Sequence, residues 1–338
     1  MGNIFINNKY FISLKLKMTK NKIFLSDDTL EKALHLLNSG KLVALPTETV
    51  YGLAADACSD KAVASVFALK ERPAFNPLIA HFYSPEQIKE YTEITPLAET
   101  LLKNFAPGPL TLVLNRKRTA PLSDLVTAGL DTLAVRIPNH PIAQYLLEKF
   151  GRPLAAPSAN PSETLSPTQA SHVKIAFKNS KNRPFIIDGG PCQQGLESTI
   201  LDARGDTPIL LRPGGLALEE IERLTGISVK LDPQDSKIRS PGQLKRHYAP
   251  KTPLKLNVKV PSTDVAYLAF GPTTSCTDEA CLQLSATKDL EEAAANLFSM
   301  LRKLDSFNKK VICVAPIPEF GLGLAINDRL KRASYTKY

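Results

Sequence analysis

The sequence lacks several features that would place it in a common class. It contains no tryptophan, and its longest apolar runs are strand-sized, such as 42–45 and 209–211. These runs fall far short of the roughly 20 apolar residues that a membrane-spanning helix needs. The GxxxxGK[ST] phosphate loop, the GxSxG elbow and the HExxH zinc motif are also missing. These absences argue against a membrane-spanning protein, a P-loop NTPase, an α/β-hydrolase and a zinc protease.

Cysteine is scarce and shows no metal-binding pattern. The five cysteines are Cys58, Cys192, Cys276, Cys281 and Cys313, an odd number without a CxxC motif. Four residues separate Cys276 from Cys281, but no second pair completes a zinc site. We therefore expect buried or incidental thiols in a reducing compartment, which indicates a cytoplasmic protein.

Positive charge is in excess. Lysine and arginine number 42 against 33 acidic residues, a net charge of +9. This excess indicates anionic partners such as nucleotides, RNA or acidic metabolites, although a merely basic surface would explain it equally well. Five lysines lie in residues 1–22 without any acid. We expect that segment to be a disordered or non-native extension, with Met18 as an alternative start.

The length of 338 residues predicts two domains. In the first, residues 23–225, a helix follows Ser26, another follows Ser59 and ends near Glu71, Ser166-Pro167 begins a third, and 217–224 form a fourth. The expected strands are 42–45, 77–83, 110–114, 132–137, 153–155, 185–188, 199–202 and 209–212.

Residues 226–252 are rich in proline and poor in hydrophobic periodicity, which predicts a linker or lid. The pattern then restarts in residues 253–338. Strands at 265–270 and 311–314 flank a helix at about 288–304, and a last helix begins near Gly323. This strand–helix–strand spacing predicts a small parallel sheet.

Three polar clusters lie at the ends of predicted strands, where α/β proteins commonly bind ligands. They are residues 46–52, residues 70–81 with Lys70, Arg72, Asn76 and His81, and residues 156–161. The second combines cations with proline-restrained backbone, which suits phosphates and carboxylates. Taken one at a time, each has an ordinary structural explanation as a capped loop, a helix C-terminus or a turn.

Together, these clusters resemble a known family. The motifs are PTETVYGL (46–53), KxR (70–72), RPAFNPL (72–78), Arg136-Ile137-Pro138, SxN (158–160), SPG (240–242), HYAP (247–250) and GLGLAINDRLKRA (321–333). They closely resemble the YrdC-like threonylcarbamoyl-AMP synthases in their long, two-domain form. The resemblance implies a twisted mixed-sheet α/β domain with a concave basic groove, followed by a small Rossmann-like α/β domain.

The resemblance also implies a reaction. The family joins L-threonine, bicarbonate and ATP into threonylcarbamoyl-AMP and releases pyrophosphate. A downstream threonylcarbamoyl-transferase complex then modifies the adenosine beside the anticodon of certain tRNAs, and whether this chain binds tRNA itself stays open. Mg²⁺ is expected because it accompanies ATP, without a metal site made by the protein.

The resemblance assigns residues to the two substrates. Lys70 and Arg72 are the expected catalytic residues. The ATP-binding residues would be Arg72, Asn76, Thr132, Ser158, Asn160, Ser166, Arg212 and Tyr248, and the threonine-binding residues Thr49, His81, Arg136 and Ala156. Tyr248 would close over the nucleotide as a lid.

Two other functions remain open at this point. A non-enzymatic RNA-binding module would explain the basic balance, but aromatic residues make up only 7% and no RRM or KH signature is present. A carbamoyl-transferase of hydrogenase maturation shares the YrdC-like module but would need zinc-finger and acylphosphatase regions. Neither region is visible in the sequence.

Overall fold

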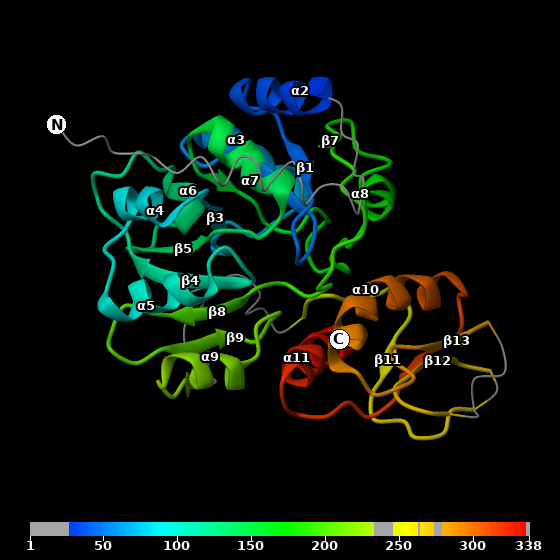
Figure 1. Ribbon diagram of the computed structural model, residues 1–338. Coiled ribbons are helices and arrows are strands. Elements are labelled where there is room, and N and C mark those ends of the chain that lie inside the picture. The colour runs from blue at the N-terminus through cyan, green and yellow to red at the C-terminus, as the bar shows by residue number, and fades with distance from the viewer. Residues whose placement is uncertain (1–26, 233–245, 263, 274–278, 336–338) are drawn as a thin grey trace.

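The computed structural model describes residues 27–232, 246–262, 264–273 and 279–335. Over these residues the chain forms a large mixed sheet with its helices and a smaller parallel sheet with two further helices (Figure 1). This confirms the predicted fold class, while the concave basic groove stays a prediction. No helix in the described ranges is long and apolar enough to cross a membrane.

The larger sheet has ten strands among the described residues, in the order β10-β9-β8-β4-β5-β3-β6-β2-β1-β7. β3 and β5 are parallel, as are β4 and β8, whereas β4 and β5 are antiparallel. The strands are β1 (Val43–Leu45), β2 (Gly52–Asp56), β3 (Ile79–His81), β4 (Leu110–Asn115), β5 (Thr132–Arg136), β6 (Leu154–Ala155), β7 (Phe185–Ile186), β8 (Thr199–Asp202), β9 (Ile209–Arg212) and β10 (Lys230–Leu231). β10 falls within the predicted linker, whose boundaries stay a prediction.

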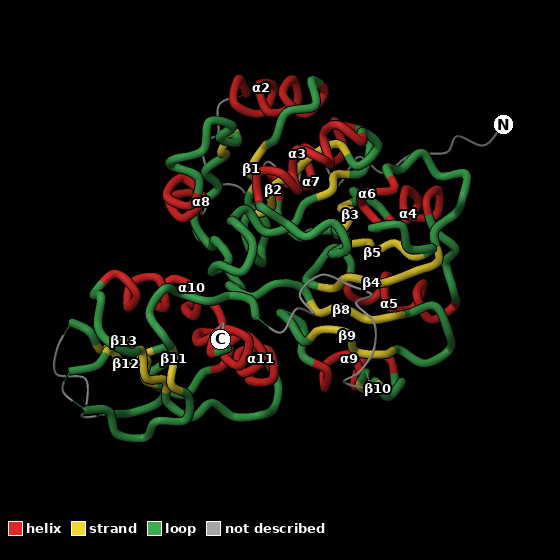
Figure 2. Tube along the Cα trace, turned by 180° about the vertical axis from the view of Figure 1, so that it is seen from behind, coloured by secondary structure: helices red, strands yellow, loops and turns green. Residues whose placement is uncertain are grey.

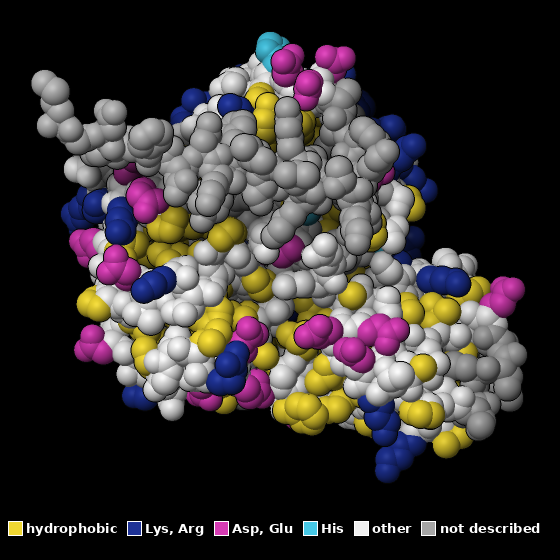
Figure 3. All heavy atoms as spheres, viewed as in Figure 1, with side chains coloured by type: hydrophobic (Ala, Val, Ile, Leu, Met, Phe, Trp, Pro, Cys, Tyr) yellow, Lys and Arg dark blue, Asp and Glu magenta, His cyan; other side chains and the backbone are white. Residues whose placement is uncertain are grey.

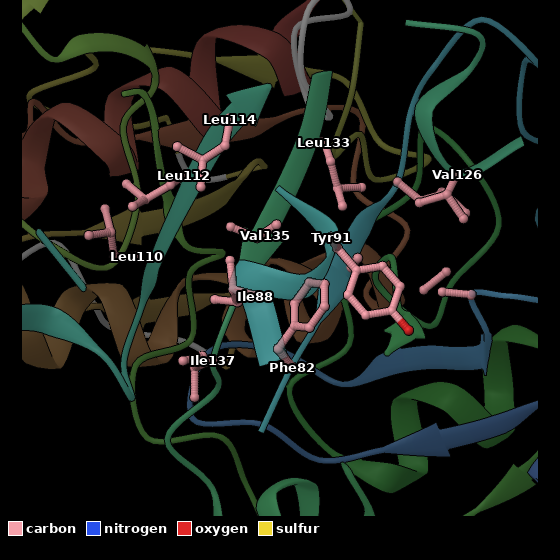
Figure 4. Packing of buried hydrophobic residues seen from close by; sticks show 14 of the residues in the cluster. Phe82, Ile88, Tyr91, Leu110, Leu112, Leu114, Val126, Leu133, Val135 and Ile137 are labelled. Carbon is pink, nitrogen blue, oxygen red and sulfur yellow. The ribbon is translucent and has the colours of Figure 1, made fainter. Parts of the chain in front are cut away.

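Helices pack against both faces of this sheet. They are α2 (Asp27–Asn38), α3 (Asp60–Lys70), α4 (Pro85–Tyr91), α5 (Pro96–Phe105), α6 (Asp124–Thr127), α7 (Pro141–Phe150), α8 (Ala170–Ala176) and α9 (Leu218–Thr225). The main core lies between the sheet and the group that includes α3, α4 and α5. Figure 4 shows Phe82 and Tyr91 in this core, with ring centroids 5.4 Å apart.

Side-chain alternation decides which face carries polar groups. In β5, Leu133 and Val135 point into the main core, and Ile137, just after the strand, does the same. Ala134 instead joins a small cluster on the opposite face. Arg136, two residues further along the strand, points to the same side as Ala134. Because successive strand residues point to opposite faces, Arg136 is presented on the face away from the main core.

Local signals set both ends of α3. The Ser59 side chain accepts a hydrogen bond from the Ala62 N–H at the N-cap, as predicted. Glu71 ends the helix in the left-handed region, with φ of 52°. The chain therefore turns sharply between Lys70 and Arg72, at the KxR motif.

One predicted helix is wrong. Ser166-Pro167 does not begin a helix, since α8 starts at Ala170 with Gln169 as its N-cap. The Ser166 hydroxyl instead donates to Glu197, and the Pro167 carbonyl accepts from the Tyr51 N–H. These long-range bonds outweigh the local capping signal. The predicted Ser26 cap and the SPG motif at 240–242 lie outside the described residues.

The smaller sheet confirms the prediction of a parallel α/β unit. Its strands run in the order β11-β14-β12-β13, all pairs being parallel in the described part. The elements are β11 (Leu254–Lys255), β12 (Ala266–Ala269), β13 (Cys281–Gln283), β14 (Ile312–Val314), α10 (Leu290–Ser306) and α11 (Leu322–Ser334). Cys281 is disulfide-bonded, so the expectation of free thiols is wrong for this residue. Cys58, Cys192 and Cys313 are free.

The two units share a core. Leu165 and Leu196 of the larger unit belong to the same buried cluster as Leu297 and Phe298 of α10. Figure 2 shows α10 and α11 on the side of the smaller sheet that faces the larger unit. The smaller unit is therefore docked against the larger one through a continuous apolar contact.

Candidate functional site

One pocket collects most of the predicted site residues. It lies where β3, β5 and β9 end, and His247 and Tyr248 complete its wall. Seven predicted residues line it: Arg72, His81, Arg136, Ala156, Ser158, Arg212 and Tyr248. Residues as far apart in sequence as Arg72 and Tyr248 thus meet at one place.

Strand pairing explains part of this convergence. His81 and Arg136 are register partners on the parallel strands β3 and β5. Their side chains reach the same edge because the carboxyl ends of parallel strands coincide. Ala156 and Ser158 follow β6, which pairs with β3 on its other side.

Arg72 is held by its own loop. Its Nε donates to the Asn76 carbonyl at 3.0 Å, and one terminal nitrogen donates to Asn76 Oδ1 and to the Pro77 carbonyl, both at 2.7 Å. Burial, reinforced by the nearby charge of Arg212, lowers the pKa of Arg72 to about 9. The guanidinium therefore stays cationic at neutral pH in a fixed orientation.

Lys70 lies behind the pocket wall and ties two motifs together. Its buried Nζ donates to the carbonyl oxygens of Ser158 and Asn160, both at 2.5 Å. Burial and the charge of Arg72 lower the pKa of Lys70 well below its ordinary value, although Glu197 opposes the shift. A bound anion would relieve this accumulation of positive charge.

Arg136 forms a buried ion pair. One terminal nitrogen lies 2.7 Å from Glu48 Oε1, and both side chains are 5% exposed. Its Nε donates to the Gly108 carbonyl at 3.3 Å. Glu48 Oε2 is buried and has no hydrogen-bond partner within the described part of the chain. The pair fixes the plane of a guanidinium that lines the pocket.

A second buried cluster lies around Glu197. Its Oε2 accepts a 2.8 Å hydrogen bond from Nε of Arg329, and its Oε1 accepts one from Ser166. Burial alone would raise the pKa of Glu197, but the charges of Arg329 and Arg212 and the Ser166 hydroxyl lower it to about 2. Arg212 donates to the Ser198 carbonyl at 2.7 Å. Glu197 is thus ionised and forms part of the pocket wall.

The turn after Arg212 requires a glycine. A Cβ on Gly214 would lie 2.4 Å from the Glu197 carbonyl oxygen and 2.3 Å from the Ser198 carbonyl carbon. No side chain fits there, so only glycine lets this turn approach the 197–198 backbone. The close approach places the end of β9 against the pocket.

Tyr248 is packed on several sides. Its ring stacks on Phe298 at 5.7 Å between centroids, and the Arg329 guanidinium lies 5.0 Å from its centroid. The residue is 1% exposed and adopts φ of 61°. Tyr248 therefore contacts both the pocket and the C-terminal unit.

The remaining predicted residues lie outside the pocket wall formed by the described residues. Asn76 orients Arg72, and Thr49 bonds Thr47 at 2.8 Å inside the 46–51 loop. Asn160 Nδ2 donates to the carbonyls of Pro161 and Thr164, while Ser166 holds Glu197. Thr132 begins β5, four residues before Arg136, and strand rise places it about 13 Å from the pocket end.

Three charged residues at the site were not predicted. Glu48 lies within the quoted PTETVYGL motif, and Arg329 lies within the quoted 321–333 motif, but neither had a role. Glu197 has no local signal at all. Each acts through a partner that is more than 80 residues away in sequence, so no spacing rule reveals it.

The two buried pocket histidines predict loss of stability in acid. Burial lowers the pKa of His81 and of His247 to about 3 each. In the unfolded chain both would titrate near 6.5, so that state takes up protons first as the pH falls. The stability present above pH 6.5 is therefore lost between about 6.5 and 3, with roughly 2 kcal/mol per histidine lost by pH 5.

Urea unfolding at pH 7.5 and pH 5.0 measures this loss. A His247→Gln variant should lose less stability between the two pH values than the parent does. An equal loss in both proteins would show that His247 does not titrate between folded and unfolded states.

Known proteins are similar to this chain in sequence and fold. Residues 35–214 match the Sua5–YciO–YrdC family model, which is described as telomere recombination. Residues 216–334 match the model described as the threonylcarbamoyl-AMP synthase C-terminal domain. The threonylcarbamoyl-AMP synthase of Pyrococcus abyssi is 42% identical over 316 residues, covering 88% of this chain and 92% of that one. That of Bacillus subtilis is 39% identical over 344 residues, covering 96% and 97%.

The likeness extends to three dimensions. The crystal structure of P. abyssi Sua5 complexed with L-threonine superposes with a TM-score of 0.83 and 41% sequence identity. The match covers 92% of this chain and 95% of that chain. The chain therefore belongs to the threonylcarbamoyl-AMP synthase family, in the long form that carries both the Sua5–YciO–YrdC domain and the C-terminal domain.

Proposed function

We propose that this chain joins L-threonine, bicarbonate and ATP into threonylcarbamoyl-AMP, with release of pyrophosphate and of the water lost when the amine and bicarbonate form the carbamate. The observation that carries the proposal is the convergence of Arg72, Arg136 and Arg212 on one pocket, with Lys70 behind its wall. Such a site suits a crowd of anions, namely a carboxylate, a carbamate and a triphosphate. The family membership supports the same reaction.

The substrate positions follow from the charges. Arg136 would take the threonine carboxylate, because its guanidinium is already fixed by Glu48 beside the neutral His81. Arg72 and Arg212, on other walls, would take the phosphates, while Lys70 lies behind the wall and holds the 158–160 loop. Threonine carbamate would then lie near the α-phosphate, and its oxygen would form the new P–O bond as pyrophosphate leaves. Positioning and charge stabilisation carry most of such a transfer.

Tyr248 and His247 would exclude water from the mixed anhydride product. Both are buried and line the pocket. Closure of a site over a reactive intermediate protects it from hydrolysis. This is the lid role that the resemblance implies for Tyr248.

The described side chains around the pocket offer no set of ligands for a metal ion. No group of three or more His, Cys, Asp or Glu side chains among the described residues is arranged to hold a metal ion. The pocket carboxylate, Glu197, is already paired with Arg329. The proposed Mg²⁺ would therefore arrive on the phosphates of ATP, and we derive no step through it.

Pyrophosphate release tests the proposal. Purified protein with ATP, L-threonine and bicarbonate should release pyrophosphate, and the rate should fall to background when threonine is omitted. Equal release with and without threonine would end the synthase assignment. Its product would supply a tRNA-modifying transferase complex, with the cytoplasm as the expected setting.

An RNA-binding module without turnover gives the opposite result. It would bind tRNA with a steep salt dependence and release no pyrophosphate. On the face in Figure 3, the described acidic and basic side chains are interspersed. The enclosed cationic pocket therefore favours a small anionic substrate over an extended RNA surface.

A further inference from the structure

The C-terminal domain places a charge directly behind the pocket wall. Arg329, on α11, is 1% exposed, and its Nε lies 2.8 Å from Glu197 Oε2. Its Nη1 donates to the Pro213 carbonyl at 2.9 Å, in the turn that follows Arg212. Its guanidinium also lies against the Tyr248 ring. One side chain thus contacts three segments around the pocket from the other domain.

Glu197 is out of place in a site for anions. Among the described residues that line the pocket it is the only acidic one, whereas Arg72, Arg136 and Arg212 are cationic. An uncompensated carboxylate in this low-dielectric setting would repel phosphate groups. Arg329, which also pairs with Asp328 at 2.6 Å, offsets part of this unfavourable charge beside Arg212, and its share depends on α11 being docked.

Close contacts of α10 with the larger unit also dock the C-terminal domain. A Cβ on Gly195 would lie 2.5 Å from the Ala294 carbonyl oxygen, so the backbones of the two domains approach closely there. Gly195 also has φ of 70°, which side chains rarely adopt. Thr168 Oγ1 and Ser299 Oγ lie 2.9 Å apart across the same interface. The interface is tight enough to hold Arg329 in place.

We propose that Arg329 is a positioning residue through which docking of the C-terminal domain sets the polyphosphate affinity of the pocket. Because Arg329 pairs with Glu197, the net charge that an incoming anion meets in the pocket is set by the three pocket arginines. This deepens the proposed function and rests on it for the identity of the anion. The role of the C-terminal domain is then to complete the site.

A double-mutant cycle tests this role with inorganic tripolyphosphate as the probe. Isothermal titration calorimetry compares the full-length parent with Arg329→Gln, Glu197→Gln and the double variant. Arg329→Gln should weaken binding about tenfold, as expected when a buried charge loses its partner. In the Glu197→Gln background the same change should alter binding by less than about threefold, because no carboxylate is left to neutralise. Lys331→Gln, an exposed change on the same helix, should bind like the parent.

Two outcomes for the Arg329→Gln variants would overturn the proposal. One is parental tripolyphosphate binding by Arg329→Gln. The other is an equal loss in both backgrounds, which would show that Arg329 acts by packing alone. Failure of the parent itself to bind tripolyphosphate would contradict it as well.

A second variant covers the case in which Arg329→Gln does not fold. Gly195→Ala removes no pocket side chain but opposes docking. It should weaken tripolyphosphate binding and enlarge the radius of gyration measured by small-angle X-ray scattering. An enlarged protein with parental binding would disconnect docking from the pocket. Threonine-dependent pyrophosphate release tests the proposed reaction separately, because the pocket can bind anions even if the protein does not catalyse that reaction.

Discussion

Arg136→Lys should lower kcat/KM for L-threonine about 100-fold, the size expected when a buried, charged hydrogen-bonded contact is lost. The Arg136 guanidinium contacts Glu48 at 2.7 Å and the Gly108 carbonyl at 3.3 Å while it lines the pocket. Lysine has one nitrogen on a flexible chain, so it cannot hold Glu48 and a substrate carboxylate in the same plane. The loss should appear in kcat/KM for threonine rather than for ATP.

Lysine is the better substitution because it keeps the charge beside Glu48. Arg136→Ala would leave a buried carboxylate unpaired, at a cost of about 3–5 kcal/mol in folding stability. Arg152→Lys is the matched control, since Arg152 pairs with Asp56 at 3.0 Å away from the pocket. It should have parental kinetics. Parental kinetics in Arg136→Lys would place the threonine carboxylate on another group.

Local signals predicted much of the fold. β4, β5 and β8 were expected within one residue of their ends, because each is a short apolar run bounded by polar or turn residues. The Ser59 cap is similarly local, since the bond it makes reaches only to Ala62. The helices from Pro85 to Phe105 were not predicted, although a serine or threonine cap precedes a proline in both. The same hydroxyl–proline pattern that gave a wrong prediction at Ser166 would have predicted these two helices correctly.

Long-range contacts explain that difference. Ser84 and Thr95 accept bonds from residues three positions ahead, whereas Ser166 donates to Glu197, 31 residues away. The sequence does not show which partner a hydroxyl will choose. The order of strands in the larger sheet is hidden for the same reason, since β4 pairs with β8 across more than 80 residues.

The motifs located the pocket better than they assigned roles. Asn76 and Ser166 were expected to contact ATP, but the structure gives them bonds to Arg72 and Glu197. A motif records that a residue type is needed at a position, whether it touches a ligand or holds a neighbour. Their contact with ATP stays a prediction, and their bonds suggest a supporting part.

Arg72→Lys should lower kcat/KM for ATP about 100-fold or more, which is comparable to losing one fixed electrostatic contact to a transferring group. Three hydrogen bonds to Asn76 and Pro77 fix the Arg72 guanidinium. Lysine would lose this fork, and its ammonium would sample several positions. Asn76→Ala should produce a smaller loss in the same direction, because it removes only the side-chain contact.

The comparison of these two variants separates positioning from charge. Arg116→Lys is the control, because Arg116 also combines an ion pair with a carbonyl contact, to Asp124 at 2.6 Å and Leu122 at 2.7 Å, outside the pocket. It should leave steady-state kinetics unchanged. If Arg72→Lys were as active as the parent while Asn76→Ala was impaired, Asn76 itself would be the ATP contact. The orientation of Arg72 would then serve only to hold the 72–77 loop.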